Sequence, residues 1–598
     1  MTMAPSTSPF QLKSSFQLLF KIWSYLSFRR KFQFFLLLCL MLLSSFAELM
    51  SLGAVIPFLS ILSNPEAVWS NQSAYKIAYF LGYRDASELI FPITFIFVFT
   101  CFLASVIRLL SIWANGKYSA SIGSDISILS YRKTLYQPFI VHVKRNSSEV
   151  INTITLQTAR TTAGFTAFLQ MTSSSLISLS LFVGFFVIDW KIALSAVILF
   201  SIVYSLIARF TSKKLKNNSA IVSSNSQFLI KVLQEGLGAI RDLLLDKSQQ
   251  FFVETYAAAD REQRLRLANN QFLASFPRYS LETLGIIFIA LLGYSMLLEG
   301  NNPSFVLPFL GTIALGSQKL LPSLQQVYSS WAKLRGFQSD LLGVLTLLLQ
   351  DEIQNTNKVK PLINFSDIVF NSVNFSYDSN NNFVNKSINI KINSNEIIGI
   401  IGETGSGKST FIDLFMGLLE PTDGRILVNG KDLHNSSCGS LLDSWRASIS
   451  HVPQNIYLTD TSFIENIAFG VPKKEIDHER VFHAAQQACI FDYIDSTPEG
   501  FNTLVGEKGV RMSGGQMQRI GIARALYKSS SIIVLDEATS ALDMNTELAV
   551  MNNLTSQSFR STFVIIAHRL STLKNCDRII KIENGAVVED NSNFHIFD

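Results

Sequence analysis

The sequence predicts two unlike domains: an all-α domain of six membrane-spanning helices over residues 1–350, and an α/β P-loop domain with an antiparallel β subdomain over residues 364–598. The first part holds apolar runs longer than a soluble core needs, whereas short strands and helices alternate from Asn364 onward. In the second part, the stretch EIIGIIGETGSGKST turns an apolar run into a glycine-rich loop. Residues 351–363 are assigned to a linker.

Composition and charge exclude several classes of protein. Of the 598 residues, 47 are Phe and only 16% are charged, which fits a chain with a large membrane part. The net charge of +5 is small for this length and gives no case for nucleic acid as a partner. The five cysteines are scattered without metal-like spacing, so neither a disulfide framework nor a zinc site is indicated.

Six apolar runs are candidates for membrane spans, since about twenty apolar residues cross the hydrocarbon core as a helix. They are Phe32–Leu62, Phe91–Trp113, Phe165–Ile188, Ile192–Ala208, Phe276–Leu298 and Phe305–Leu324. The fourth run is short and the fifth carries charges. Pro57 in the first run and Pro322 in the sixth predict helix kinks.

Basic residues set the predicted orientation. The connections after the second and fourth runs are rich in Lys and Arg, whereas the other connections carry only Lys76, Arg84 and Lys191. Both termini and the α/β domain are therefore predicted on the cytoplasmic side of the cell membrane, inner or plasma. The two basic connections are expected to be helical extensions that reverse direction near Asn146 and near Gly236.

Ionisable residues inside membrane spans are expensive and are candidates for function. Arg108, Arg278 and Lys319 fall toward the cytoplasmic third of their spans, and Glu48 lies deeper in the first. One interpretation is that the cations reach the headgroups or pair with Glu282 and Glu48. The other is that they face an internal cavity and hold an anionic, phosphate-bearing substrate headgroup.

The glycine-rich loop fits the pattern G-x-x-x-x-G-K-[ST]. Its glycines let consecutive backbone N–H groups face phosphate oxygens at the positive end of the following helix, while the Lys reaches the outer phosphates and the Ser binds Mg²⁺. The predicted phosphate-contacting residues are Gly402, Glu403, Thr404, Gly405, Ser406, Gly407, Lys408, Ser409 and Thr410.

Two strand ends are predicted to bring catalytic groups beside this loop. SIIVLDEATS, from Ser531, reads as a buried parallel strand that ends in Asp536 and Glu537. Asp536 is expected to hold Mg²⁺ through water, and Glu537 to act as general base on the water that attacks the γ-phosphate. His568, which ends the strand in STFVIIAHRLS, is placed to orient the same water.

Other strand signals frame the loop. Tyr377 ends an alternating strand and is either packed or stacked on an adenine ring. Asn429-Gly430 and Asn584-Gly585, each flanked by apolar residues, predict hairpins and therefore antiparallel strands beside the parallel sheet.

A second glycine-lined helix start follows. In RMSGGQMQRIGIARAL, the residues Ser513, Gly514 and Gly515 open a long amphipathic helix whose N-terminus suits an anion. One chain therefore has two phosphate-binding helix starts but one nucleotide loop. Two copies of the chain facing each other would resolve this mismatch.

Together these motifs resemble the ordered motifs of ATP-binding cassette (ABC) transporters. The resemblance is carried by the loop, by Gln454 in HVPQN, by MSGGQ, by LDEATSALD through Asp543, and by His568 in AHRLS. The six spans and their two long cytoplasmic connections are similar to those of an exporter-type half-transporter. Met512 stands where the family more often has Leu, a swap of similar volume.

The resemblance implies ATP and Mg²⁺ as cofactors and a homodimer in the lipid bilayer. Each ATP would lie between Gly402–Ser409 of one subunit and Ser513, Gly514, Gly515 and Gln516 of the other, with Tyr377 against the adenine. Gln454 would contribute to Mg²⁺ binding and to the attacking water, and Asp543 would link the two sites. The reversals near Asn146 and Gly236 would dock on the ATPase domains.

The cargo is less defined. FAELMSLGAVIPFLSIL, from Phe46, and QKLLPSLQQV, from Gln318, look like the branch that flips lipid-linked oligosaccharides. This favours an amphipathic, anionic, lipid-linked substrate over the alternatives of a multidrug, hydrophobic-compound or peptide exporter. Two rivals from other classes are a soluble cassette ATPase, which would require the six spans to be misread, and an ATP-gated channel of the same architecture.

Overall fold

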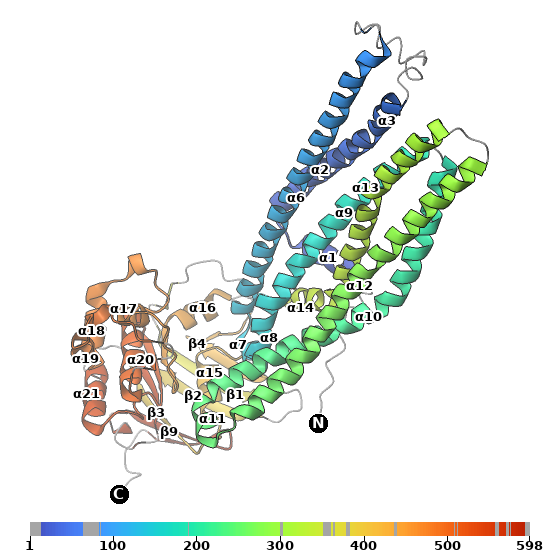
Figure 1. Ribbon diagram of the computed structural model, residues 1–598. Coiled ribbons are helices and arrows are strands. Elements are labelled where there is room, and N and C mark those ends of the chain that lie inside the picture. Colours follow the sequence, from blue (N-terminus) through green and yellow to red (C-terminus); the bar gives the residue numbers. More distant parts are fainter. Residues whose placement is uncertain are drawn as a thin grey trace. The chain divides into compact units, whose positions relative to one another are not determined.

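The computed structural model describes residues 14–63, 83, 85–188, 190–298, 303–350, 360–362, 365–377, 383–435, 439–506, 509–510, 512–555, 561–567, 569, 573–574 and 576–591. By its contacts the chain divides into two compact units. Unit 1 comprises Met1–Gln137 and Lys144–Ile353, and unit 2 comprises Pro138–Val143 and Gln354–Asp598. Unit 1 is helical and unit 2 is α/β, which confirms the predicted fold class (Figure 1).

Unit 1 consists of long helices joined by short ones (Figure 1). In chain order they are α1 (Ser15–Ser24), α2 (Phe28–Gly53), α3 (Val55–Ser63), η1 (Ala86–Leu89), α6 (Ile90–Leu135), α8 (Ser147–Asn152), the π-helical turn η2 (Thr153–Gln157), α9 (Thr158–Ile188), α10 (Trp190–Gly238), α11 (Ile240–Asp246), α12 (Gln249–Leu298), α13 (Pro303–Gly336) and α14 (Gln338–Leu348). Helix α7 (Phe139–Lys144) lies between α6 and α8 and falls almost entirely in unit 2.

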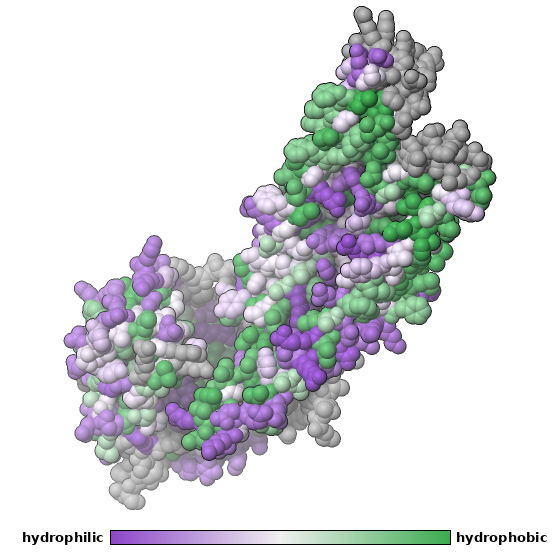
Figure 2. Space-filling view, in the orientation of Figure 1, coloured by the Kyte–Doolittle hydropathy of each residue, from purple (hydrophilic) through white to green (hydrophobic). Residues whose placement is uncertain are grey.

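Much of unit 1 has the length and surface of a membrane domain. Among the described residues, four helical stretches are long and apolar enough to cross a membrane: Phe28–Leu62, Ser87–Leu135, Ser147–Val187 and Gln249–Met296. The fourth and sixth predicted runs lie in α10 and α13, which are not among these four, so the predicted count of six is not confirmed. Figure 2 shows hydrophobic side chains gathered along the helices of unit 1.

The first predicted span breaks at Gly53 because of Pro57. Helix α2 ends at Gly53, and α3 begins at Val55. Pro57 has no N–H to donate, and its ring clashes with the carbonyl four residues earlier, which is that of Gly53. The predicted kink is therefore confirmed. Helix α13, by contrast, continues as one helix through Pro322, and the kink expected there stays a prediction.

Both predicted reversals are present. At the first, α7 leads into α8, whose N-cap Asn146 accepts a hydrogen bond from the N–H of Ser148. At the second, which lies a few residues beyond Gly236, α11 ends in Lys247 with the left-handed φ of 52°. Phe139 of α7 packs on a hydrophobic cluster of unit 2.

Unit 2 contains two sheets within the described ranges. The antiparallel sheet has the order β2-β1-β4-β5, from β1 (Asp367–Phe375), β2 (Asn385–Asn393), β4 (Asp423–Val428) and β5 (Lys431–Asp432). The other has the order β10-β9-β3-β8-β7-β6, from β3 (Ile397–Ile401), β6 (Ile449–Val452), β7 (Ile532–Asp536), β8 (Thr562–Ile566), β9 (Arg578–Glu583) and β10 (Ala586–Asn591). Strands β9, β3, β8, β7 and β6 pair in parallel, so the ends of β3 and β7 lie at the same edge.

The two predicted hairpins are confirmed. Strand β4 pairs with β5, and β9 with β10, both antiparallel. In each turn the Asn and the Gly both have positive φ, at 50° and 74° for Asn429 and Gly430 and at 48° and 83° for Asn584 and Gly585. These angles suit a two-residue turn between strands of normal twist.

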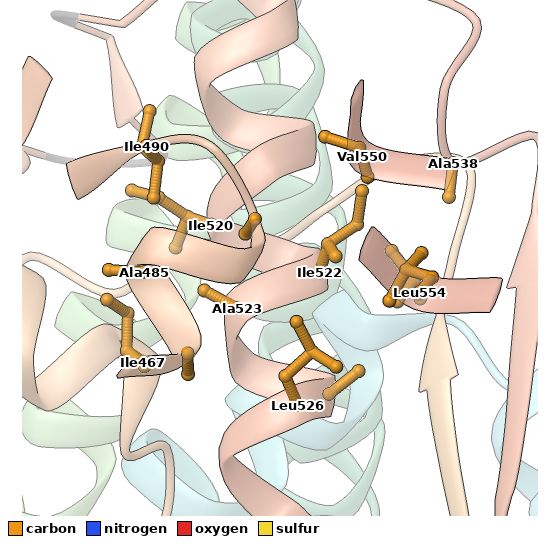
Figure 3. Packing of buried hydrophobic residues seen from close by; sticks show 14 of the residues in the cluster. Ile467, Ala485, Ile490, Ile520, Ile522, Ala523, Leu526, Ala538, Val550 and Leu554 are labelled. Carbon is orange, nitrogen blue, oxygen red and sulfur yellow. The ribbon is translucent and has the colours of Figure 1, made fainter. Parts of the chain in front are cut away.

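A hydrophobic cluster fixes the helix that follows the second glycine-rich motif. Figure 3 shows Ile520, Ile522 and Leu526 of α20 (Gly514–Lys528) among side chains from neighbouring elements, including Val550 and Leu554 of α21 (Met544–Thr555). These five side chains are almost completely buried. Their burial holds the N-terminus of α20 beside the segment that follows β7.

Candidate functional site

The glycine-rich loop connects β3 to α15 (Lys408–Phe415). Gly402, Gly405 and Gly407 have φ of 154°, 85° and 98°, which L side chains rarely adopt. A Cβ at Gly402 would meet the carbonyl oxygen of Ile582 at 2.2 Å. Glycine is therefore required here both for backbone conformation and for space.

Residues outside the motif brace the loop. Asn385 is fully buried and its side-chain N–H donates to the carbonyl oxygen of Gly407 at 3.3 Å. The N–H of Gly585, in the β9–β10 turn, donates to the carbonyl oxygen of Ser406 at 3.0 Å. No motif contains Asn385, which lies 17 residues before the loop begins, so sequence reasoning did not select it.

The Lys408 ammonium is held within the loop. Its Nζ donates to the carbonyl oxygens of Gly402 at 2.6 Å and Glu403 at 2.8 Å. Burial lowers the pKa of Lys408, and the carboxylates of Glu537 and Asp536 oppose this change. The structure thus brings the loop and the predicted carboxylates into one electrostatic neighbourhood.

Glu537 follows β7 in a strained backbone conformation, with φ of 48°. Its N–H donates to the carbonyl oxygen of Ile566, at the end of β8, at 3.1 Å. Its Oε2 accepts from Nε2 of Gln454 at 2.7 Å, so two residues predicted to act on one water molecule are in direct contact. Burial and the charge of Glu537 raise the pKa of Asp536, and Lys408 lowers it.

Gln518 positions this segment and was not singled out by the sequence. Its Nε2 donates to the Glu537 carbonyl at 3.3 Å and to Oγ of Ser540 at 3.0 Å, and its Oε1 accepts from the N–H of Ala541 at 2.9 Å. Gln518 is 5% exposed and sits one turn into α20. One signal was available: Gln518 is a polar residue on the apolar face of the predicted helix, two residues after the MSGGQ motif.

Of two further predicted residues, the structure describes Tyr377 but not His568. The Tyr377 hydroxyl is 3.3 Å from Oγ1 of Thr410, at the start of α15. The ring packs edge-to-face on Phe375 with centroids 4.9 Å apart, and stacking on an adenine stays a prediction. His568 lies outside the described residues.

The start of α20 forms a capping box. Oγ of Ser513 accepts from the N–H of Gln516 at 3.2 Å, and the Gln516 side chain accepts from the N–H of Ser513 at 2.8 Å. Gly515 packs so closely on the next segment that a Cβ would lie 2.9 Å from the carbonyl oxygen of Ala541. Asp543 caps α21 by accepting from the N–H of Thr546 at 3.0 Å, a contact that lowers the pKa of Asp543.

The residues of the loop fit a nucleotide triphosphate with Mg²⁺. The glycines form a cradle at a helix N-terminus that a Cβ would obstruct. The hydroxyl of Ser406 is buried and has no hydrogen-bond partner among the described residues, as expected of a group that donates to a ligand. Ser409 is exposed at the first turn of α15, where a metal-binding hydroxyl is accessible.

A second group of charges lies in unit 1. Glu48 of α2 is 4% exposed, and its carboxylate pairs with Arg108 of α6 at 3.1 Å and with Lys319 of α13 at 2.9 Å. Lys319 Nζ is also 2.5 Å from Oγ of Ser51. We call Glu48, Ser51, Arg108 and Lys319 the ionic cluster. With one anion and two cations it carries a net charge of +1.

The structure separates the three cations that the sequence grouped. Arg108 and Lys319 share Glu48, with side chains 42% and 33% exposed. Arg278 instead pairs with Glu282 on its own helix at 2.8 Å and is 56% exposed. It lines a different cavity of about 620 Å³, between α12 and α13.

A comparison with protein families decides what unit 2 is. A family model described as "ABC transporter" matches residues 385–540, which include the loop, Gln454, Ser513–Gln516 and Glu537. The chain is an ABC transporter of the exporter type. Its unit 2 holds the ATP-binding domain, ATP hydrolysis is coupled to transport, and its apolar helices make it a multi-pass membrane protein.

Relatives cover most of this ABC transporter. It is 28% identical over 515 residues, 83% of each chain, to the "Beta-(1-->2)glucan export ATP-binding/permease protein NdvA" of Bartonella bacilliformis. It is 29% identical over 490 residues, 80% of each chain, to the "ATP-dependent lipid A-core flippase" of Escherichia coli. Its fold matches a bacterial Atm1-family ABC exporter with ATP bound, with a TM-score of 0.77 and 21% identity over 94% of this chain and 95% of that one.

Proposed function

We propose that this ABC transporter works as a homodimer that hydrolyses ATP between the loop of one copy and the start of α20 of the other. Lys408 would hold the outer phosphates, and Ser409, Asp536 and Gln454 would hold Mg²⁺, which supplies charge neutralisation at the phosphates. Glu537 would take the proton of the attacking water, with Gln454 orienting its carboxylate. His568 would orient the same water, Tyr377 would stack on the adenine, and Asp543 would connect the two sites.

Two observations support a second copy. The chain has a second glycine-lined helix start at Gly514 and Gly515, which Ser513 and Gln516 cap within the chain, and a helix N-terminus of this kind suits an anion. The tip of the second reversal exposes apolar side chains, with Leu237 71%, Ile240 47%, Leu244 60% and Leu245 75% exposed. A patch of this kind on a cytoplasmic tip is typical of a protein contact, and we propose that it docks on the ATPase domain of the other copy.

A mixed dimer tests the shared site. Lys408→Ala and Ser513→Arg should each abolish ATPase activity alone. When the two variants are co-assembled, each mixed dimer retains one site with an intact loop and an intact α20 start. Random mixing should therefore restore roughly a quarter of wild-type activity, since half of the dimers are mixed and each has one good site. No recovery in verified mixed dimers would show that each site belongs to one chain.

For the cargo, we propose an amphipathic, anionic, lipid-linked molecule. The observation that carries this is the ionic cluster. Its one buried carboxylate pairs with two partly exposed cations, so the cluster as a whole has a net charge of +1 inside unit 1. An uncompensated charge among membrane helices is expensive unless it serves a ligand. The glucan exporter and the lipid A-core flippase among the relatives support a large or lipid-attached substrate.

Transport in proteoliposomes separates this cargo from a hydrophobic drug. The assay would follow ATP-dependent translocation of a fluorescent polyisoprenyl diphosphate, its uncharged alcohol and a cationic dye. The proposal expects the diphosphate to move and to stimulate ATPase activity, with no movement in the Glu537→Gln variant. Movement of the dye alone would establish a drug exporter, and downhill flux without ATP turnover would establish a channel.

We also propose that both termini and unit 2 face the cytoplasm of the inner or plasma membrane, with the linker at residues 351–363. The basic connections after the second and fourth runs support this orientation. Limited proteolysis of sealed inside-out vesicles should cut both termini, whereas right-side-out vesicles should protect them.

A further inference from the structure

An apolar cavity lies next to the ionic cluster. Its volume is about 600 Å³, and it is lined by α2 and α3 around their break, by α6 and by α9. We call it the break pocket. Gly53 and Pro57 belong to its wall, so the recess lies at the break between α2 and α3. A volume of this size is within the range of pockets that bind small ligands.

The break pocket is suited to hydrocarbon and poorly suited to water. Its wall includes Ile93, Ile96 and Val183, and Thr100 is its one residue with a side-chain hydroxyl among the described lining residues. Thr100 Oγ1 donates to the carbonyl oxygen of Phe97 on its own helix at 2.9 Å, so that hydroxyl is already bonded. Water needs two or more polar partners to stay in a cavity, and among the described side chains of this wall only Thr100 carries a hydroxyl.

The ionic cluster, which could bind the polar end of a ligand, lies one or two helical turns from the break pocket. Leu52, in the pocket wall, follows Glu48 by one turn of α2, and Thr100 precedes Arg108 by two turns of α6. At 1.5 Å per residue these offsets are roughly 6 and 12 Å along the helices. Leu320, which follows Lys319, packs in the same buried cluster as Leu52. The ionic cluster therefore lies at one end of the pocket.

We propose that the break pocket binds one hydrocarbon chain of the transported anionic amphiphile, while the phosphate of that molecule lies against Arg108 and Lys319. This rests on the proposed function and adds the place of the lipid chain. Glu48 keeps both cations in position, and its own burial leaves their exposed sides for the phosphate. A ligand with only a chain, or only a phosphate, would use half of the site.

The structure offers a variant that fills the pocket without strain. A Cβ at Gly53 would meet no heavy atom within 4 Å, so Gly53→Leu places its side chain in open space. Gly116 of α6 also has open space around a Cβ and lies outside the pocket wall, so Gly116→Leu is a matched control. Ile96→Trp, at a residue that is 56% exposed, fills the pocket from α6 if Gly53→Leu does not fold.

The test is photolabelling of the full-length transporter in phosphatidylcholine nanodiscs with hexadecyl phosphate that carries a diazirine on its chain. Labelled peptides are located by mass spectrometry. We expect label in residues 49–57 and 183–187, with at least a fivefold loss in Gly53→Leu or Ile96→Trp, no loss in Gly116→Leu, and a clear loss in Lys319→Gln. Size-exclusion profiles and thermal melts verify the folding of each variant.

Three results would overturn the inference. Equal labelling by the uncharged hexadecanol analogue would show that an ordinary bilayer chain occupies the pocket. Undiminished labelling in a folded, pocket-filled variant would place the chain elsewhere. Absence of label from these segments would show that protein, such as a partner subunit, fills the pocket. ATP-driven transport of the probe, measured separately, tests the proposed function: transport without pocket labelling removes only this inference, and pocket labelling without transport removes only the cargo.

Discussion

The nucleotide site and the ionic cluster bring charges together in opposite ways. In the nucleotide site, residues 402–410 are contiguous, and backbone groups at positive-φ glycines form much of the surface. In the ionic cluster, side chains from three helices converge, and Glu48 and Lys319 are 271 residues apart in the chain. A site built from one continuous backbone segment can be recognised as a sequence motif, whereas a site built from side chains of separate helices has no such motif.

The two regions also differ in what a removed charge leaves behind. Glu537 is in a site that also holds Lys408, Asp536 and Gln454, and water can compensate part of any loss. Glu48 is 4% exposed among membrane helices, so loss of a partner leaves a buried charge that water cannot reach. Breaking a buried ion pair typically costs several kcal/mol. Variants of the two regions should therefore fail differently, in chemistry for the first and in assembly or substrate binding for the second.

The largest effect is expected from Glu537→Gln. The amide cannot accept the proton of water, so ATP should still bind while turnover falls by about 10²- to 10⁴-fold, the usual contribution of a general base. Single-turnover hydrolysis and nucleotide binding in nanodiscs measure the two steps. The exposed Glu499→Gln is a matched control and should hydrolyse ATP normally. Hydrolysis in Glu537→Gln within tenfold of wild type would contradict its role as base.

A pH test uses the buried carboxyl of Asp340, which lies outside the membrane-spanning segments. Asp340 of α14 is 1% exposed and pairs with Arg160 at 3.3 Å. Burial raises the pKa of Asp340 to about 6 from the ordinary 3.8, and Arg160 only partly opposes this. Because the pKa of Asp340 is higher in the folded than in the unfolded protein, proton binding to this carboxyl stabilises the fold. This contribution to the free energy of unfolding is fully present below about pH 4 and is lost as the pH rises through about 6. The difference between 3.8 and about 6 corresponds to about 3 kcal/mol.

Thermal unfolding of wild type and Asp340→Asn between pH 4 and 7 checks this expectation. The variant cannot ionise at this position, so its stability relative to wild type should rise as the pH increases. A constant difference between the two proteins across this range would show that the Asp340 carboxylate is ionised throughout.

An intermediate effect is expected from the intramembrane cations. Arg108→Gln and Lys319→Gln should each lower transport of the anionic lipid by about 10- to 150-fold, because each removes a charge-assisted contact worth about 1.5–3 kcal/mol. Arg278→Gln breaks a pair within one exposed helix and should change transport by less than twofold. The measurement is translocation per ATP hydrolysed. Equal effects of all three variants would remove the distinction between the ionic cluster and Arg278.

The smallest effect is expected from Gln518→Met, which keeps the volume but removes three hydrogen bonds to the segment after β7. A positioning residue should lower kcat by about three- to tenfold while leaving the KM for ATP nearly unchanged. Gln518→Glu keeps an acceptor for the N–H of Ala541 and should restore part of the rate. A change in KM alone would show that Gln518 acts on nucleotide binding instead.

Much of the fold followed from the sequence because its signals are local. Alternation of strands and helices, the two Asn-Gly turns and Pro57 each depend on neighbours within a few residues, and the structure has the features they predict. The six-span count depended on thresholds of length and hydropathy, and α10 and α13 do not reach them over the described residues. Asn385 could not be selected, because its partner Gly407 is 22 residues away and no motif marks it. Gln518 lies beside a motif, but its partners after β7 are distant in the chain, so its positioning role could not be read from the sequence.

By itself the sequence determined the nucleotide loop and the carboxylates after β7. A backbone cradle needs glycine at fixed spacing in one continuous segment, and a parallel strand delivers its last residues to a known edge. Only the tertiary structure decided that Arg108 and Lys319 share Glu48, that Arg278 stands apart, and that the break at Pro57 opens a pocket beside them. The physical reason is that packing of long helices sets which side chains meet, and helical periodicity alone does not specify the partner helix.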